Sequence, residues 1–157
     1  MTSGRIGIAS DHGGKELKKL VFDFLKLTEF EIVDYGIGVE NDNSVDYPDY
    51  AELLATDISA GKLERGIVIC GTGIGMCIVA NKFPGVRAAS VSCEYTARMS
   101  RLHNDANVLC LGGRTLNHHR AVDFTKIWLE TAYESGRHDL RLGKVRNIEQ
   151  RNFLPRS

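Results

Sequence analysis

The sequence has no excess of either charge, only three prolines and no long apolar run. It carries 20 Lys and Arg residues against 20 Asp and Glu residues, so its formal net charge at pH 7 is zero. A balanced charge gives no electrostatic reason to expect binding to nucleic acid or to a membrane surface. The apolar runs are far shorter than the roughly 20 residues that a membrane-spanning helix needs. We therefore expect no nucleic-acid partner and no membrane partner.

The sequence lacks closely spaced cysteine pairs, and this argues against two common uses of cysteine. The four cysteines, Cys70, Cys77, Cys93 and Cys110, contain no Cys-x-x-Cys pair. Such spacing favours neither a zinc site nor a disulfide framework, and it is typical of free thiols in a reducing compartment. The first expected strand begins near Ile6, which leaves no room for a signal peptide. We expect a cytoplasmic protein without a bound metal.

Short apolar runs alternate with helical patterns along the whole chain. At 157 residues the chain suits one domain over residues 1–157. Strands are expected at residues 6–10, 31–35, 67–69, 87–91 and 108–111. Helices are expected at about residues 17–25, 49–61, 75–81, 95–102, 121–132 and 140–150. Strands that alternate with helices predict an α/β fold, with a five-stranded parallel sheet covered by helices on both faces.

Polar residues follow three of the expected strands directly. Asp11 and His12 come after the first strand, Cys70 and Thr72 after the third, and Arg114 after the fifth. Ligands of such folds bind beyond the carboxyl ends of the strands. The sequence therefore predicts one site that collects a carboxylate, an imidazole, a thiol, a hydroxyl and a guanidinium.

The loop after Cys70 is suited to an anion. Glycines at positions 71, 73 and 75 remove side-chain bulk, so backbone N–H groups can face a ligand. A helix that starts near Gly75 would add its positive end and favour the thiolate of Cys70. The structural alternative is that Cys70 is a small buried core residue. A dinucleotide-binding loop is a weaker alternative, because Met76 stands where that fingerprint has Gly or Ala.

Two further groups lie in the second half of the chain. His103 ends an expected helix, where it could donate a proton to a sugar oxygen or, with Asn104, simply end the helix. Arg137 and Arg141 are four residues apart, hence on one helical face, and guanidinium groups hold phosphate oxygens in a fork. The alternative for this arginine pair is a solvated basic face.

We expect no functional role for the other cysteines, for two adjacent histidines or for two large aromatic residues. We interpret them as core thiols (Cys77, Cys93, Cys110), exposed polar residues at a helix start (His118, His119) and packing residues (Trp128, Tyr133).

Several motifs resemble one family of enzymes. They are S-D-H-G-G at 10–14, S-V-D-Y-P-D-Y at 44–50, C-G-T-G-I-G-M at 70–76, A-N-K at 80–82, R-L-H-N-D-A-N at 101–107, L-G-G-R-T at 111–115 and G-R-H at 136–138. Together they span residues 6 to about 148. With these motifs the sequence resembles the type B ribose-5-phosphate isomerases and the related galactose-6-phosphate isomerase subunits.

The resemblance implies a fold, an assembly and a reaction. The fold would be a Rossmann-like three-layer α/β/α sandwich, assembled as a homodimer, or as a tetramer in some members, with active sites between subunits. The reaction would interconvert D-ribose 5-phosphate and D-ribulose 5-phosphate, in the non-oxidative branch of the pentose phosphate pathway, without a cofactor or a metal.

The resemblance also implies roles for individual residues. Cys70 would be the base that moves the proton, with Thr72 assisting it. His103 and Asp11 would open the sugar ring. The remaining site residues would bind the enediolate (Gly71, Gly73, Gly75), the phosphate (His12, Arg114, Arg137, Arg141) and the sugar (Tyr47, Asn104).

Two positions depart from the family pattern. Some members have a glutamate base where this chain has Met76, so the base role falls to Cys70 here. Many members have two adjacent arginines where this chain has Leu140 and Arg141, so one phosphate contact is missing. A six-carbon or deoxy sugar phosphate remains an alternative substrate, and a non-catalytic module that binds a nucleotide or a sugar phosphate remains an alternative function.

Overall fold

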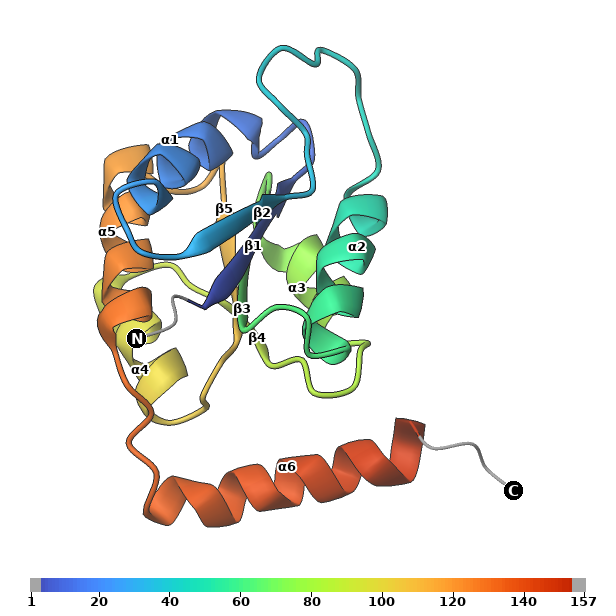
Figure 1. The fold of residues 1–157 in the computed structure, drawn as a ribbon, viewed down its shortest axis with the longest axis vertical. Helices are drawn as coiled ribbons and strands as arrows, with labels where there is room; N and C mark the ends of the chain where they lie inside the picture. The colour runs from blue at the N-terminus through green and yellow to red at the C-terminus, as the bar shows by residue number, and fades with distance from the viewer. Residues whose placement is uncertain (1–3, 154–157) are drawn as a thin grey trace.

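The computed structural model describes residues 4–153 and contains one five-stranded sheet (Figure 1). All strand pairs are parallel, in the spatial order β2-β1-β3-β5-β4. The strands are β1 (Arg5–Ser10), β2 (Glu31–Asp34), β3 (Arg65–Cys70), β4 (Ala88–Ser90) and β5 (Val108–Gly112). The predicted α/β fold with a five-stranded parallel sheet is confirmed.

The central strands are buried on both faces, as a parallel sheet between helices requires. In β3, Ile67 and Ile69 point into one apolar cluster, whereas Val68 and Cys70 point into the other. Successive side chains of a strand alternate between the two faces of a sheet, so one strand supplies both cores.

Helices form a layer on each face of the sheet (Figure 1). One layer packs into the cluster with Ile67 and contains α1 (Lys15–Leu25), α4 (Glu94–Leu102) and α5 (His118–Glu130). The other packs around Val68 and contains α2 (Tyr47–Ser59) and α3 (Ile74–Ala80). The sheet with its two layers is the expected three-layer α/β/α sandwich.

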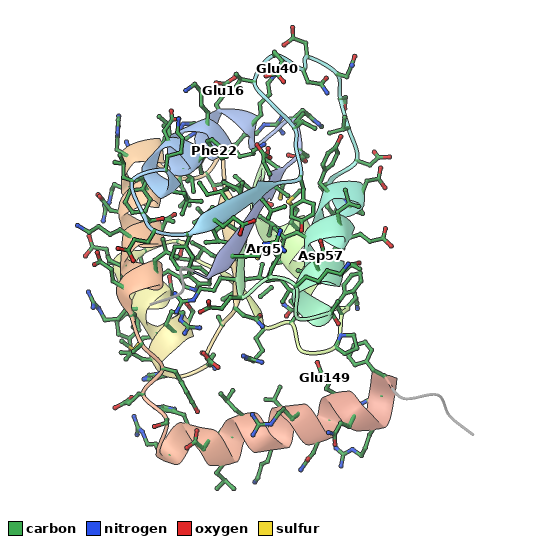
Figure 2. The ribbon with its side chains drawn as sticks, in the orientation of Figure 1. Arg5, Glu16, Phe22, Glu40, Asp57 and Glu149 are labelled. Carbon is green, nitrogen blue, oxygen red and sulfur yellow. The ribbon has the colours of Figure 1, made fainter. Side chains whose placement is uncertain are left out.

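The last helix, α6 (Arg137–Phe153), lies outside both layers, beside the amino ends of the strands (Figure 1). Leu142 buries its side chain against the body, and the Gly85 N–H donates a 2.8 Å hydrogen bond to Glu149 Oε1. Figure 2 shows Glu149 pointing from α6 toward the body. Other apolar side chains of α6, among them Leu140 and Ile148, stay exposed. In the described part of the chain, no helix is long and apolar enough to cross a membrane.

The helices begin one to three residues earlier than predicted. We expected α2 to start after Asp49, but it starts at Tyr47, with Pro48 in its first turn. Proline suits that place because the first-turn N–H groups have no partner within the helix. We expected the last helix at 140–150, but it covers Arg137–Phe153, which places Arg137 on α6 with Arg141.

Candidate active site

Three loops meet at the carboxyl ends of the strands. The N–H of Gly113 donates a hydrogen bond to the Cys70 carbonyl at 2.8 Å, and the N–H of Arg114 donates one to the Gly71 carbonyl at 2.9 Å. The loop after β1 packs equally closely, since a Cβ atom on Gly13 would lie 3.0 Å from the backbone nitrogen of Gly71. We call this meeting of the loops after β1, β3 and β5 the rim; it brings together Asp11, His12, Cys70, Thr72 and Arg114, as predicted.

Cys70 ends β3 and is almost enclosed, with 4% of its surface exposed. Its Sγ accepts a hydrogen bond from the N–H of Gly73 at 3.2 Å. Gly73 adopts a φ of +78°, and a Cβ atom there would lie 2.9 Å from the Leu111 carbonyl carbon, so only glycine fits without strain. The left-handed turn therefore aims the positive end of an N–H bond at the sulfur.

Backbone donors of the same loop remain available to a ligand. Among residues 4–153, the N–H groups of Gly71, Thr72 and Gly75 have no hydrogen-bond acceptor. The guanidinium of Arg114 lies over Gly71, where a Cβ atom would be 3.3 Å from Nη1. Unpaired N–H groups in successive residues form a cradle for an anion, and the arginine adds a full positive charge beside it.

The loop after β1 holds its two polar side chains in fixed positions. Asp11 is buried, and its Oδ1 accepts a hydrogen bond from the N–H of Gly13 at 2.9 Å. Nδ1 of His12 lies 3.1 Å from both the backbone nitrogen and the carbonyl oxygen of Val45. This contact ties the imidazole to the loop that precedes α2, and that loop is tied down again by Lys15, whose Nζ donates to the Asn41 carbonyl at 2.7 Å.

Tyr47 lines the rim from the first turn of α2. Its ring packs on Gly75, where a Cβ atom would lie 2.8 Å from two ring carbons. The tyrosine remains 39% exposed. The absence of a side chain at Gly75 therefore allows the aromatic ring to lie directly against the cysteine loop.

The other predicted site residues form a second group. His103, Asn104, Arg137 and Arg141 surround a hollow of about 380 Å³. His138 also lines this hollow: it is buried, its ring stacks on His103 with centroids 4.4 Å apart, and it pairs with Glu134 at 3.1 Å. Sequence reasoning assigned no role to His138 or Glu134, although their four-residue spacing at the G-R-H motif was a usable signal.

The two groups lie at opposite ends of the strands: the rim at their carboxyl ends and the His103 group at their amino ends. The loop that follows His103 is bonded at the beginning of the strands, since the N–H of Gly66 donates to the Asn107 carbonyl at 2.9 Å. Cys70 stands at the other end of β3. A strand of this length spans roughly 16 Å at about 3.3 Å per residue. Within one chain, therefore, the structure does not bring His103, Asn104, Arg137 and Arg141 to the Cys70 rim.

The remaining cysteines differ from one another. Cys110 is buried as predicted, and burial raises the pKa of its thiol. Cys77 is half-buried but packs against the core cluster around Val68, whereas Cys93 is half-buried outside both clusters, so the prediction of a core thiol is wrong for Cys93. A hydrogen bond with Cys110, supported by Ser90 and Asn81, lowers the pKa of Cys77 to about 7.

One of the two adjacent histidines was also misjudged. His119 is exposed as expected, but His118 is half-buried, and its Nε2 lies 2.8 Å from the Gly113 carbonyl oxygen, so it steadies the turn that carries Arg114. Trp128 is fully buried, as a packing residue should be. Tyr133 is half-buried rather than packed in the core, and its hydroxyl donates to Asp139 Oδ1 at 2.8 Å.

Comparison with known proteins gives the same family throughout. The family model described as Ribose/Galactose Isomerase matches residues 6–145. The chain is 41% identical over 149 residues to the putative sugar phosphate isomerase YwlF of Bacillus subtilis (strain 168), covering 95% of this chain and 99% of that protein.

Two solved structures are similar over nearly their whole length. Ribose-5-phosphate isomerase B of Clostridium thermocellum matches with a TM-score of 0.89 and 48% identity, covering 94% of this chain and 98% of that one. Ribose-5-phosphate isomerase B of Mycoplasma genitalium, solved with bound ribulose-5-phosphate, matches with a TM-score of 0.89 and 41% identity, covering 96% and 99%. The chain therefore belongs to the ribose/galactose isomerase family, and the prediction that it is an isomerase is confirmed.

Proposed function

We propose that this protein interconverts D-ribose 5-phosphate and D-ribulose 5-phosphate, as in the non-oxidative branch of the pentose phosphate pathway, with Cys70 as the base. The observation that carries the proposal is the rim itself: a thiol that accepts a hydrogen bond from Gly73 lies beside a loop with unpaired N–H groups. The Mycoplasma genitalium relative binds ribulose-5-phosphate, which supports the same class of substrate here.

The proton transfer would proceed at the Cys70 loop. The Cys70 thiolate takes the proton from C2 of the open-chain aldose, and the electrons form a C1–C2 double bond with negative charge on the former carbonyl oxygen. The ketose forms when the Cys70 thiol gives the proton to C1, while the proton of the C2 hydroxyl passes to the oxygen on C1. Thr72, whose Oγ1 accepts a hydrogen bond from the Ile74 N–H in the same loop, would assist this transfer. The unpaired N–H groups of Gly71 and Gly75 stabilise the enediolate, while the N–H of Gly73 is directed at the Cys70 sulfur. Each well-placed donor contributes about 3–4 kcal/mol to such a step.

Ring opening and substrate binding require the remaining residues. A sugar ring opens when the ring oxygen gains a proton and the anomeric hydroxyl loses one, and we assign these transfers to Asp11 and His103. His12 and Arg114 hold the phosphate from the rim, with Arg137 and Arg141 from the second group. Two neutral groups, Tyr47 and Asn104, contact the sugar.

A complete site needs a second copy of the chain. His103 and the two arginines lie at the far edge of the sheet from Cys70, so these residues reach the rim only from a partner. In a dimer with twofold symmetry, the rim of each copy meets the His103 group of the other, which gives two equivalent sites. We therefore infer a homodimer with active sites between subunits, and a tetramer would be a pair of such dimers.

Exposed apolar side chains support this assembly. On α3, beside the rim, Ile74 and Ile78 are 58% and 56% exposed. On α6, beside the His103 group, Leu140 is 70% exposed. Apolar surface next to each half of the site is what a contact between two copies would bury.

The proposal also covers the extent and the location of the domain. We assign residues 1–157 to one sugar-phosphate isomerase domain, since the family match covers residues 6–145. The four cysteines are free, which suits a reducing compartment such as the cytoplasm.

The reaction is tested by incubating the purified protein with ribose 5-phosphate in heavy water and following both sugars by NMR. We expect ribulose 5-phosphate to form, with deuterium entering C1 to the extent that the Cys70 proton exchanges with solvent. No ketose from ribose 5-phosphate, but turnover of galactose 6-phosphate or another six-carbon sugar phosphate, would assign the other substrate class of the family. No turnover of any sugar phosphate would contradict the proposal.

A further inference from the structure

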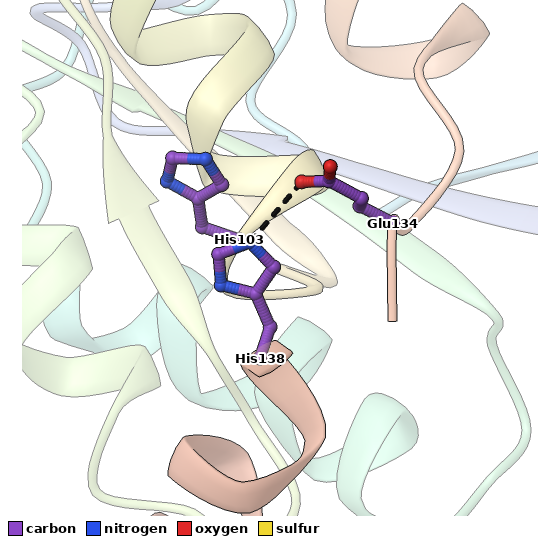
Figure 3. A group of neighbouring side chains, drawn as sticks. All are labelled: His103, Glu134 and His138. Carbon is purple, nitrogen blue, oxygen red and sulfur yellow. Dashed lines mark hydrogen bonds and ion pairs between the residues drawn. The ribbon is translucent and has the colours of Figure 1, made fainter. Parts of the chain in front are cut away.

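Three side chains with metal-binding atoms meet at the edge of the sheet where the strands begin (Figure 3). His103 follows the last turn of α4, Glu134 lies between α5 and α6, and His138 is in the first turn of α6. One ligand atom from each lies within 4.8 Å of the others. Nε2 of His138 and Oε2 of Glu134 are 3.1 Å apart.

The backbone fixes these side chains relative to one another. Ser135 and Gly136 both adopt positive φ angles, of 59° and 60°, and the resulting turn brings Glu134 back to His138. The N–H of Glu134 donates a 3.1 Å hydrogen bond to the Leu102 carbonyl, which ties this turn to the end of α4 beside His103. The turn and this hydrogen bond therefore place Glu134 beside both histidines.

We propose that His103, Glu134 and His138 bind a divalent transition-metal ion, with zinc as the best fit. Two imidazoles and one carboxylate form a known zinc ligand set, and imidazole favours zinc over magnesium or calcium, which prefer oxygen ligands. The 3.1 Å separation between Glu134 and His138 is close to the spacing of two tetrahedral ligands with bonds of about 2.0–2.2 Å. The half-buried His103 ring now stacks on His138 with an angle of 21° between the ring planes, so it would turn out of this stack to supply the third ligand.

Two arginines beside the cluster favour an anion as the fourth ligand of the ion. Arg137 and Arg141 line the same hollow of about 380 Å³. Their charges oppose a bare cation, but a zinc ion with one carboxylate keeps a positive charge that chloride, hydroxide or phosphate offsets. The arginines would hold that anion on its outer side.

Zinc at this position would act on the enzyme as an inhibitor. It would hold the imidazole of His103, which the proposed function assigns to ring opening, and this consequence rests on that function. The binding of zinc does not rest on the proposed function, because the three ligands are present whatever reaction the protein catalyses.

Binding is tested by calorimetric titration of zinc chloride into the reduced, full-length protein, without sugar phosphate. We expect one ion per chain. His138→Ala and Glu134→Gln should each weaken binding by at least about tenfold, the cost seen even for groups that merely support a metal ligand. His119→Ala, which removes an exposed histidine of α5, should bind as the wild type does. Glu134 is exposed, so Glu134→Gln tests the site even if His138→Ala fails to fold.

Cobalt(II) in place of zinc distinguishes this cluster from the cysteines. A site of two imidazoles and a carboxylate gives visible absorption without a strong thiolate-to-cobalt band in the near ultraviolet. That spectrum, lost in Glu134→Gln, supports the proposal. No binding by the wild type, equal zinc affinity in all variants, or a thiolate band would overturn it, whether or not the protein isomerises ribose 5-phosphate.

Discussion

Gly73 donates its backbone N–H to the sulfur of Cys70 over 3.2 Å, and it can do so because it adopts a left-handed conformation that a side chain would strain. The same turn leaves the neighbouring N–H groups of Gly71 and Thr72 unpaired among the described residues. One local conformation thus serves both the proposed base and the proposed anion cradle. Cys70 is only 4% exposed, so the surrounding chain encloses most of this residue.

Replacing the sulfur tests the base directly. Cys70→Ala should lower kcat by about 10²–10⁴-fold, because the general base is lost, while circular dichroism and the melting temperature change little. Cys93→Ser is the matched control: it alters a half-buried thiol at the N-cap of α4, where serine is well tolerated, and should keep normal activity. A Cys70→Ala enzyme of near wild-type rate would remove Cys70 from the base role.

The arginines of α6 should act on binding. Arg137→Ala and Arg141→Ala should each raise KM by roughly 10- to 100-fold, since each removes a charge-assisted hydrogen bond worth about 1.5–3 kcal/mol. Arg146→Ala, on the same helix and also exposed, should leave the steady-state kinetics unchanged. If KM and kcat stay at wild-type values in both variants, the arginines are a solvated basic face after all.

The contact between Gly75 and Tyr47 predicts a coupled pair. Gly75→Ala places a methyl group 2.8 Å from the Tyr47 ring, so the ring must move, and we expect a loss of about 1–3 kcal/mol in the free energy of unfolding. In Tyr47→Ala the space is open, so adding Gly75→Ala should cost clearly less. Denaturant unfolding of the four proteins measures this coupling. Strictly additive losses would mean that the two residues do not constrain each other.

The lowered pKa of Cys77 predicts selective chemistry at that thiol. Its hydrogen bond with Cys110 and those from Ser90 and Asn81 favour the thiolate and set the pKa at about 7. The alkylation rate with iodoacetamide should therefore rise with pH up to about 7 and level off above it, because only the thiolate reacts. Peptide mass spectrometry resolves the sites, and Cys110, whose pKa burial raises, should react far more slowly. A Cys77 profile that still rises steeply above pH 8 would contradict the assignment.

Much of the fold follows from local patterns. The apolar run of Ile67, Val68 and Ile69 identified a strand buried on both faces, and the strand and helix alternation predicted the parallel sheet. Helix ends do not follow from these patterns: α2 starts at Tyr47 with Pro48 in its first turn, and α6 starts after the turn at Ser135 and Gly136. Neither Pro48 nor this turn changes the spacing of the apolar residues, so the apolar pattern does not reveal where the two helices begin.

The positions of the candidate site residues in the fold could be predicted from the sequence only in part. Residues directly after strands, such as Asp11 and Arg114, had to share an edge of the sheet, and they do. His103 ends α4, and a helix that follows a parallel strand runs back to the amino ends of the strands. The order of the elements along the chain therefore already indicated that His103 lies far from Cys70. The stacking of His138 on His103 depends on how α6 turns back, which no local pattern specifies.

The most direct test of a shared site is complementation between two inactive variants. Cys70→Ala and His103→Ala, carrying different affinity tags, are co-expressed, and the doubly tagged species is isolated and assayed with ribose 5-phosphate. One site of such a dimer combines an intact rim with an intact His103 group, so we predict about half of the wild-type activity. If instead each chain contained its own complete site, the doubly tagged species would be as inactive as the two variants alone.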